Sequence, residues 1–187
     1  MKSYNPDKDL KMVITMAEYN LGINCRKLGD LDRSSELLSK AAAKDQKNPI
    51  VHNEHGLSLF EKKEYRAAMG AFGRAVENRP SAVHYNNRGL AYYHMADKMD
   101  EALEDFGRAR ECDSGDPTVY YNRGNVYLSM NRFDDAIADY SEATSIKPQE
   151  PKFHHALGLT YEAKAAHLEQ TLLKGEFDDE EFEEDEQ

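Results

Sequence analysis

Histidine and cysteine, two residue types that often hold metals or carry out catalysis, are few in this chain of 187 residues, which has seven histidines and two cysteines. The candidates are His52, His55, His154, His155, Cys25 and Cys112. No cluster of cysteines or carboxylates joins the histidine pairs at helical spacing, and neither cysteine has the close partner of a zinc or redox motif. We therefore expect no bound metal, cysteines and histidines that serve in packing, and free thiols in a reducing compartment.

The sequence also lacks the motifs that mark enzymes. It contains no nucleophile elbow, no glycine-rich loop that would cradle a phosphate, and no acid–base pair with a recognisable partner on one face. We expect a non-catalytic protein without a cofactor. The alternative is that the chain is the regulatory part of a longer enzyme.

Asparagine is the polar residue type that recurs in a pattern. The stretch AVHYNNRGLAYY, residues 82–93, is echoed about 35 residues later by TVYYNRGNVY, residues 118–127. An amide side chain donates and accepts hydrogen bonds at once, which suits the binding of an extended main chain. The echo has two interpretations, a duplicated site and a repeated structural element.

The glycines around these stretches decide in favour of a repeat. Successive glycines lie 34, 33, 35 and 34 residues apart, at Gly22, Gly56, Gly89, Gly124 and Gly158. All but the first are flanked by large residues four before and three after, as in Tyr120 and Tyr127 around Gly124. An alanine and a large residue four apart follow downstream, such as Ala136 and Tyr140. These steps place each set on one helix face and predict two interlocking helices per unit.

Capping residues support the same division. Asn48-Pro49 and Asp116-Pro117 combine a capping side chain with proline at the first helical position, and Pro151 opens a last half unit. We expect a distorted turn near residues 95–99, because the third unit carries one extra residue between its two helices.

This pattern resembles the tetratricopeptide repeat family over about residues 15 to 174. The resemblance implies an all-α fold, a right-handed α-solenoid of antiparallel helix pairs with a C-terminal capping helix. The expected parts are an N-terminal extension of the first helix (1–14), four repeats (15–48, 49–82, 83–116 and 117–150), a half unit or capping helix (151–174) and an acidic disordered tail (175–187). The first repeat departs from the pattern, with Glu18, Cys25 and Ser34 in place of an aromatic residue, a tyrosine and an alanine.

In this family, the face of each first helix that turns away from its partner lines a concave groove. The residue two before the motif glycine lies about 200° from the packing positions, so it belongs to that face. The candidate groove residues are Tyr19, Asn20, Asn53, Asn86, Asn87, Tyr93, Tyr121, Asn122 and Asn125. Family resemblance implies asparagine ladders that hold a peptide backbone; the alternative is that these amides bond water or neighbouring helices.

One family function does not fit. Co-chaperones of this family clamp the C-terminal carboxylate of heat-shock chaperones with lysine, asparagine and arginine from three consecutive repeats. Asn125 matches one asparagine, but Tyr121 and Ala156 stand where lysine and arginine are required. A carboxylate would lack its charge-assisted donors, so we reject this ligand.

Charge excludes a further class of partner. Nine of the 35 acidic residues lie in 176–187, and the remaining 26 nearly balance the 24 basic residues, without the basic stripe of a nucleic-acid binder. No stretch is long and apolar enough for a membrane span. We expect a cytoplasmic adaptor that binds a protein or peptide segment; the alternatives are a structural component of a large assembly, cytoskeletal or ciliary, and a module of a longer protein.

Overall fold

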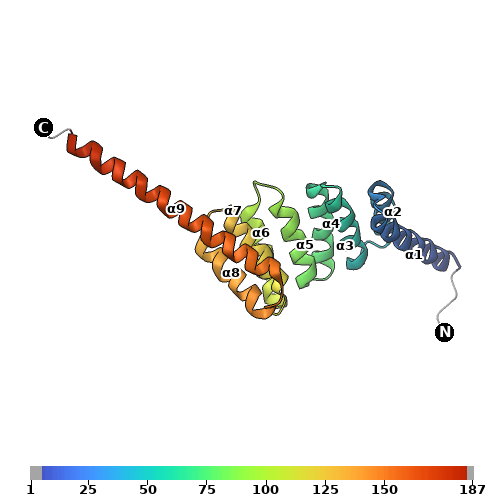
Figure 1. Ribbon diagram of the computed structural model, residues 1–187. Helices are drawn as coiled ribbons and strands as arrows, with labels where there is room; N and C mark the ends of the chain where they lie inside the picture. The colour runs from blue at the N-terminus through green and yellow to red at the C-terminus, as the bar shows by residue number, and fades with distance from the viewer. Residues whose placement is uncertain (1–5, 185–187) are drawn as a thin grey trace. The chain divides into compact units, whose positions relative to one another are not determined.

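The computed structural model describes residues 6–184, with side chains up to residue 173, and this part of the chain is helical without strands (Figure 1). It forms two compact units, residues 1–114 and 115–187. The first unit contains α1 (Pro6–Lys27), α2 (Leu31–Lys44), α3 (Pro49–Glu61), α4 (Tyr65–Asn78), α5 (Ala82–Tyr93) and α6 (Met99–Cys112). The second contains α7 (Pro117–Ser129), α8 (Phe133–Ile146) and α9 (Pro151–Glu184). The all-α fold is confirmed.

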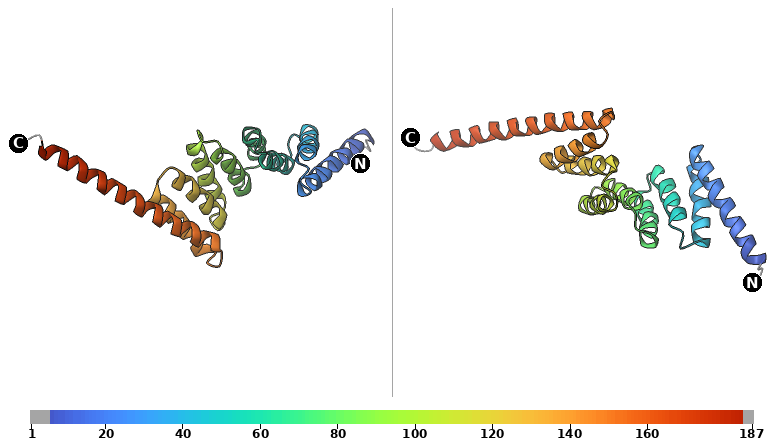
Figure 2. Two further views of the ribbon diagram at one scale, coloured as in Figure 1. Left: turned by 45° about the horizontal axis from the view of Figure 1, so that its top comes forward. Right: turned by 90° about the horizontal axis from the view of Figure 1, so that it is seen from below.

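Helices in each unit pack in the order of the chain. In the first unit α1, α3 and α5 pair with α2, α4 and α6, and each pair stacks on the next through α2 with α3 and α4 with α5. In the second unit α7 pairs with α8, and α8 packs against α9. Figure 2 shows these neighbours from two further directions.

Predicted capping residues begin the helices. The side chain of Asn48 accepts a hydrogen bond from the Ile50 amide at 3.1 Å, and that of Asp116 accepts one from the Thr118 amide at 2.8 Å. In both helices proline occupies the first turn, where its missing N–H costs nothing. Ser81 caps α5 in the same way.

Three of the four turns within helix pairs share one conformation. Each has three residues, and its middle residue is left-handed, with φ of 82° at Gly29, 64° at Lys63 and 56° at Asn131. In the first of these turns the Asp30 amide donates to the Cys25 carbonyl at 2.9 Å, and the other two turns repeat this bond. This is the Schellman motif, which satisfies carbonyl groups at a helix end.

The turn between α5 and α6 differs, as the extra residue predicts. It spans five residues, 94–98, and has no left-handed residue. The Lys98 amide donates to the Met95 carbonyl at 2.8 Å, so a local turn takes the place of the Schellman bond.

Helix packing in each unit is dense around a large side chain of the second helix. Phe72, Phe106 and Tyr140 have at most 1% of their surface exposed, and alanines such as Ala68 and Ala136 have none exposed. Complete burial of one such ring contributes about 2–3 kcal/mol to folding. Small residues beside large ones let neighbouring helices approach closely, as the sequence pattern predicts.

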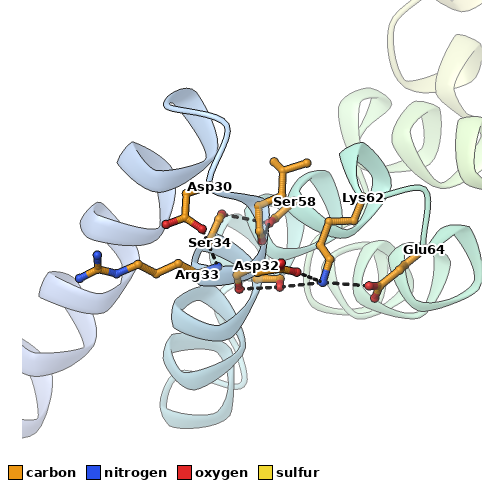
Figure 3. A network of polar contacts seen from close by, with 9 residues as sticks. Asp30, Asp32, Arg33, Ser34, Ser58, Lys62 and Glu64 are labelled. Atoms are coloured by element: carbon orange, nitrogen blue, oxygen red, sulfur yellow. Dashed lines mark hydrogen bonds and ion pairs between the residues drawn. The ribbon is translucent and has the colours of Figure 1, made fainter.

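The contact between the first two repeats is partly polar, which explains one departure from the family pattern. Ser34, in an alanine position, is fully buried, and its Oγ accepts a hydrogen bond from Ser58 Oγ at 2.9 Å (Figure 3). Beside this pair, Lys62 Nζ lies 2.9 Å from both Asp32 Oδ1 and Glu64 Oε1. The two serines satisfy each other, so their burial carries no unpaired polar group.

The last helix covers α8 and then extends beyond it. Phe153 and Thr160, with 1% and 0% of their surface exposed, lie on the side that packs against α8. The expected end of this helix at residue 174 is ten residues short, because the backbone of α9 is helical to Glu184. A single glycine, Gly175, costs a helix about 1 kcal/mol and does not by itself end it. Residues 185–187 of the expected tail lie outside the described residues.

Candidate functional site

Motif glycines separate the packing face of each first helix from the face that remains for binding. A Cβ atom on Gly22 would lie 2.7 Å from Leu38, one on Gly56 2.5 Å from Phe72, and one on Gly124 2.7 Å from Tyr140. Distances below 3.0 Å do not occur between real Cβ atoms and their neighbours. In these repeats the glycine is therefore required by the partner helix and takes no part in recognition.

Motif arginines also serve the structure. Arg88 Nε and Nη2 each donate to a carboxylate oxygen of Asp105 at 2.7 Å, and Arg123 makes the same pair with Asp139. The carboxylates are almost buried, with 4% and 6% of their side chains exposed. The hydrogen-bonded carboxylate raises the pKa of each arginine above its ordinary value. Each arginine thus pairs with the helix that follows its own, and neither is available to a ligand.

Candidate amides of the first unit lie on three first helices, α1, α3 and α5, whose contacts with one another follow chain order. Asn20 is exposed on α1, whereas Asn53 on α3 is 8% exposed. Asn87 on α5 is half-buried, and its Nδ2 donates to Asn53 Oδ1 at 2.8 Å. The repeat thus brings amides 34 positions apart into direct contact.

The other candidates of this unit flank the amides. Tyr19, Asn86 and Tyr93 are each partly exposed. Burial, reinforced by the nearby Glu54 carboxylate, raises the pKa of the Tyr19 hydroxyl above its ordinary value. The Tyr93 ring lies 5.5 Å from that of His94, measured between centroids. We name Tyr19, Asn20, Asn86, Asn87 and Tyr93 the amide–tyrosine face.

An ion-pair cluster that the sequence reasoning missed borders this face. Arg26 Nη2 lies 2.8 Å from Glu54 Oε2, and its Nη1 lies 2.7 Å from Glu61 Oε1. Glu54 occupies the same repeat position as Asn20 and Asn87, so a charge replaces an amide there. Arg26 shares no motif with its partners, and only the contact between α1 and α3 brings them together.

In the second unit the three candidate residues, Tyr121, Asn122 and Asn125, make more contacts within the fold than those of the first unit. Asn122 is 7% exposed, and Asn125 Oδ1 accepts a hydrogen bond from Tyr140 Oη at 2.7 Å. The Tyr121 ring packs against Tyr140 and Phe153, with centroids 5.8 and 5.5 Å away. These contacts give each side chain a partner in the fold and leave a smaller exposed surface than we expect from helix geometry alone.

Histidines and cysteines occupy structural positions. Among residues whose side chains are described, no group of three or more histidines, cysteines and carboxylates could hold a metal. His52 Nε2 donates to the Gln46 carbonyl at 2.8 Å, and His154 Nε2 makes the equivalent bond with Pro148. Cys25 is buried as expected, but the expectation that Cys112 packs is wrong, because it is exposed in the last turn of α6.

No helix within residues 6–184 has both the length and the apolar character needed to cross a membrane.

Comparison with known proteins gives the same repeats. A family model described as tetratricopeptide repeat matches residues 19–83 and 53–117, and one described as TPR repeat matches 124–164. The crystal structure of the MamA protein is 27% identical and superposes with a TM-score of 0.73, covering 81% of this chain and 83% of that one. Cut9 in the Cut9–Hcn1 complex of the APC/C is 24% identical with a TM-score of 0.70, over 78% of this chain and 30% of that chain, and supports the fold alone.

Curated relatives are much longer than the matched region. The DnaJ homolog subfamily C member 7 homolog of Dictyostelium discoideum is 27% identical over 69% of this chain and 24% of its own length. Serine/threonine-protein phosphatase 5 of Homo sapiens is 34% identical over 49% of this chain and 18% of its own length. Because the repeat models cover more than half of the residues and the solved structures share the solenoid fold, the chain belongs to the tetratricopeptide repeat family.

Proposed function

We propose that this chain is a non-catalytic protein-interaction module, an adaptor or scaffold that binds an extended segment of another protein on the amide–tyrosine face. The hydrogen bond between Asn87 and Asn53 carries the proposal. It supports the view that amides at adjacent repeat positions, three and two residues before the motif glycine, connect neighbouring first helices. A row of groups that both donate and accept matches the alternating N–H and C=O groups of an extended chain.

The amides and the tyrosine rings of this face favour a ligand segment that offers both backbone N–H groups and apolar side chains. Asn87 uses its Nδ2 on Asn53, which leaves its Oδ1 to accept a bond from a ligand N–H. Tyr19 and Tyr93 supply flat, partly exposed rings, a residue type that contributes much of the energy in protein interfaces. Arg26 lies between the carboxylates of Glu54 and Glu61, so this cluster carries one net negative charge, and we expect at most a weak selection of the ligand by charge.

Two residues of the original candidate set contribute less in this proposal. Asn122 is almost buried and Asn125 holds Tyr140, so we assign both to support of the fold. Tyr121 stays a candidate contact in the second unit. Lys152 Nζ lies 5.4 Å from its ring centroid, and this lysine alone does not make a clamp for a C-terminal carboxylate.

The cysteines bear on the compartment in which the chain works. The unpaired thiols of Cys25 and Cys112 favour the cytoplasm as the working compartment. We propose no enzymatic activity, nucleic-acid ligand or membrane attachment for these repeats. Any catalytic domain would lie in a longer protein of which the chain forms part.

Affinity capture with photocrosslinking tests this function. Wild type is compared with the double variant Asn20→Ala/Asn87→Ala and with a control, Glu36→Ala/Lys40→Ala, which removes an exposed ion pair on α2. We expect the captured protein to crosslink to α1, α3 or α5 and to lose at least about tenfold in affinity with the amide variant only. Unchanged binding by a folded amide variant would contradict the proposal.

The structural alternative predicts a different outcome. Exposed apolar residues gather near the start of α1, at Leu10, Met12, Val13, Ile14 and Met16. If the chain docks by an edge in a large assembly, substitutions there should abolish capture while the amide variant binds normally.

A further inference from the structure

The last helix repeats the first half of a unit without the second half. Gly158 stands at the motif position, yet a Cβ atom there would meet nothing within 4 Å. At the equivalent place the four earlier glycines contact Leu38, Phe72, Phe106 and Tyr140. The described part of the chain therefore leaves one glycine notch unfilled, and the four filled notches define its complement as a large apolar side chain on an adjacent antiparallel helix.

The open notch belongs to a longer stripe along α9. The stripe residues follow one another at alternating steps of four and three and are all exposed: His154, Gly158, Tyr161, Ala165, Leu168 and Leu172. Tyr161, Leu168 and Leu172 keep 54%, 51% and 68% of their surface exposed. The stripe lies about 120° around the helix from Phe153 and Thr160, which face α8.

Alternating steps of four and three, seven residues for each pair of steps, are the repeat of a coiled-coil seam. Over residues 154–172 the seam is about 28 Å long at 1.5 Å per residue. Figures 1 and 2 show that α9 continues well past α8, so its outer part has no neighbour within the second unit. Surface leucines scattered singly need no explanation, but a periodic stripe of this length indicates a helix partner.

We propose that the stripe pairs with the same stripe of a second copy of this chain, with the two α9 helices antiparallel. In one register Gly158 faces Leu168 of the second copy, Tyr161 faces Ala165, and His154 faces Leu172. Each layer then sets a small or medium residue against a large one, as glycine and leucine meet at Gly22 and Leu38. The stripe carries both the notch and the side chain that fills it, which selects a second copy as occupant.

Charge selects the antiparallel direction. A parallel pair would bring together the two segments 176–187, each with nine carboxylates, whereas an antiparallel pair places them at opposite ends. The antiparallel arrangement also places His155 beside Glu169 of the second copy. At the two-fold axis Glu162 would meet Glu162 and Lys164 would meet Lys164, which weakens the pair, although Asp134 already neutralises Lys164 at 2.5 Å. We therefore expect a reversible, concentration-dependent dimer.

Sedimentation analysis over a range of concentrations tests the pairing. It compares the full wild-type chain with single variants at two adjacent leucines. Leu172 lies in the stripe, and Leu173, 55% exposed, lies about 100° around the helix. Leu172→Glu should raise the dimer dissociation constant at least about tenfold, and Leu173→Glu should change it less than about twofold. Both side chains are exposed, so circular dichroism should show equal helix content.

Spin labels at residue 173 distinguish an antiparallel from a parallel pair of α9 helices. The label is placed by Leu173→Cys in a Cys112→Ser background, since Cys112 is exposed and Cys25 is buried. In the proposed register the two labelled positions are about 30 Å apart, whereas parallel helices would bring them within about 15 Å. A chain that stays monomeric at every concentration, a dimer insensitive to Leu172→Glu, or a short label distance would each overturn the proposal. Loss of partner capture in the amide variant would leave this result unaffected.

Discussion

Comparing Gly124→Ala with Gly158→Ala isolates the energy of the close helix contact that defines the repeat. Both glycines hold the same motif position within the second unit. A Cβ at position 124 would lie 2.7 Å from Tyr140, and one at position 158 would meet nothing within 4 Å. Alanine is favoured over glycine in a helix by about 1 kcal/mol at both sites, so this term cancels in the comparison.

The remaining difference is the cost of forcing a methyl group against Tyr140. This ring has no exposed surface, and its Oη is held by Asn125 at 2.7 Å, so it cannot move aside freely. Inserting one methylene into a packed core costs about 1–3 kcal/mol. We expect Gly158→Ala to stabilise the second unit by up to about 1 kcal/mol and Gly124→Ala to be about 1–3 kcal/mol less stable than Gly158→Ala.

Urea unfolding followed by circular dichroism measures both changes, and residue-resolved hydrogen exchange in α7 and α8 assigns them to the second unit. The samples are kept dilute, so that pairing of α9 helices does not contribute to stability. Equal shifts for the two variants, within about 0.5 kcal/mol, would refute the packing account of the glycine period.

Three further outcomes follow from the buried and strained groups. Asp139→Ala should lower the free energy of unfolding in urea by about 3–5 kcal/mol, because Arg123 then keeps a nearly buried charge without a partner. The control Glu104→Ala removes an exposed ion pair and should cost less than about 0.5 kcal/mol. Equal costs would contradict the assignment of Asp139 to the core. Burial lowers the pKa of His55 from 6.5 to about 4, so the unfolded state takes up the proton first and stability falls as pH drops from 6.5 to 4. His55→Gln should remove about 1–2 kcal/mol of that loss, discounted for partial exposure, in urea unfolding repeated across this pH range, and an unchanged pH dependence would contradict the assignment. Lys63→Gly should stabilise the first unit by up to about 1 kcal/mol in thermal unfolding, because φ of 64° strains a lysine; no gain would mean that the turn relaxes.

Local sequence signals were sufficient to predict the helices and which of them pair. The large residues around each glycine, the caps at Asn48 and Asp116 and the extra residue before Met99 each act within about two turns of helix, so they can be recognised along the chain.

Exposure of the amides could not be predicted in this way. Asn20, Asn87 and Asn122 hold one repeat position, but they range from exposed through half-buried to almost completely buried. What covers each amide is a neighbour from another repeat or from the adjacent helix, and helical periodicity contains no information on that neighbour. The Arg26–Glu54 pair escaped the sequence analysis for the same reason, because its partners share no motif.

The sequence by itself determined that this chain is a set of helical repeats, because spacing along one helix decides which side chains share a face. Tertiary structure decided which of those faces is occupied. Gly124 and Gly158 hold the same motif position in their helices, yet the place beside Gly124 is filled by Tyr140 and the place beside Gly158 is open. That difference arises because a contact needs a second helix at the right distance, and only the folded chain shows where that helix is present.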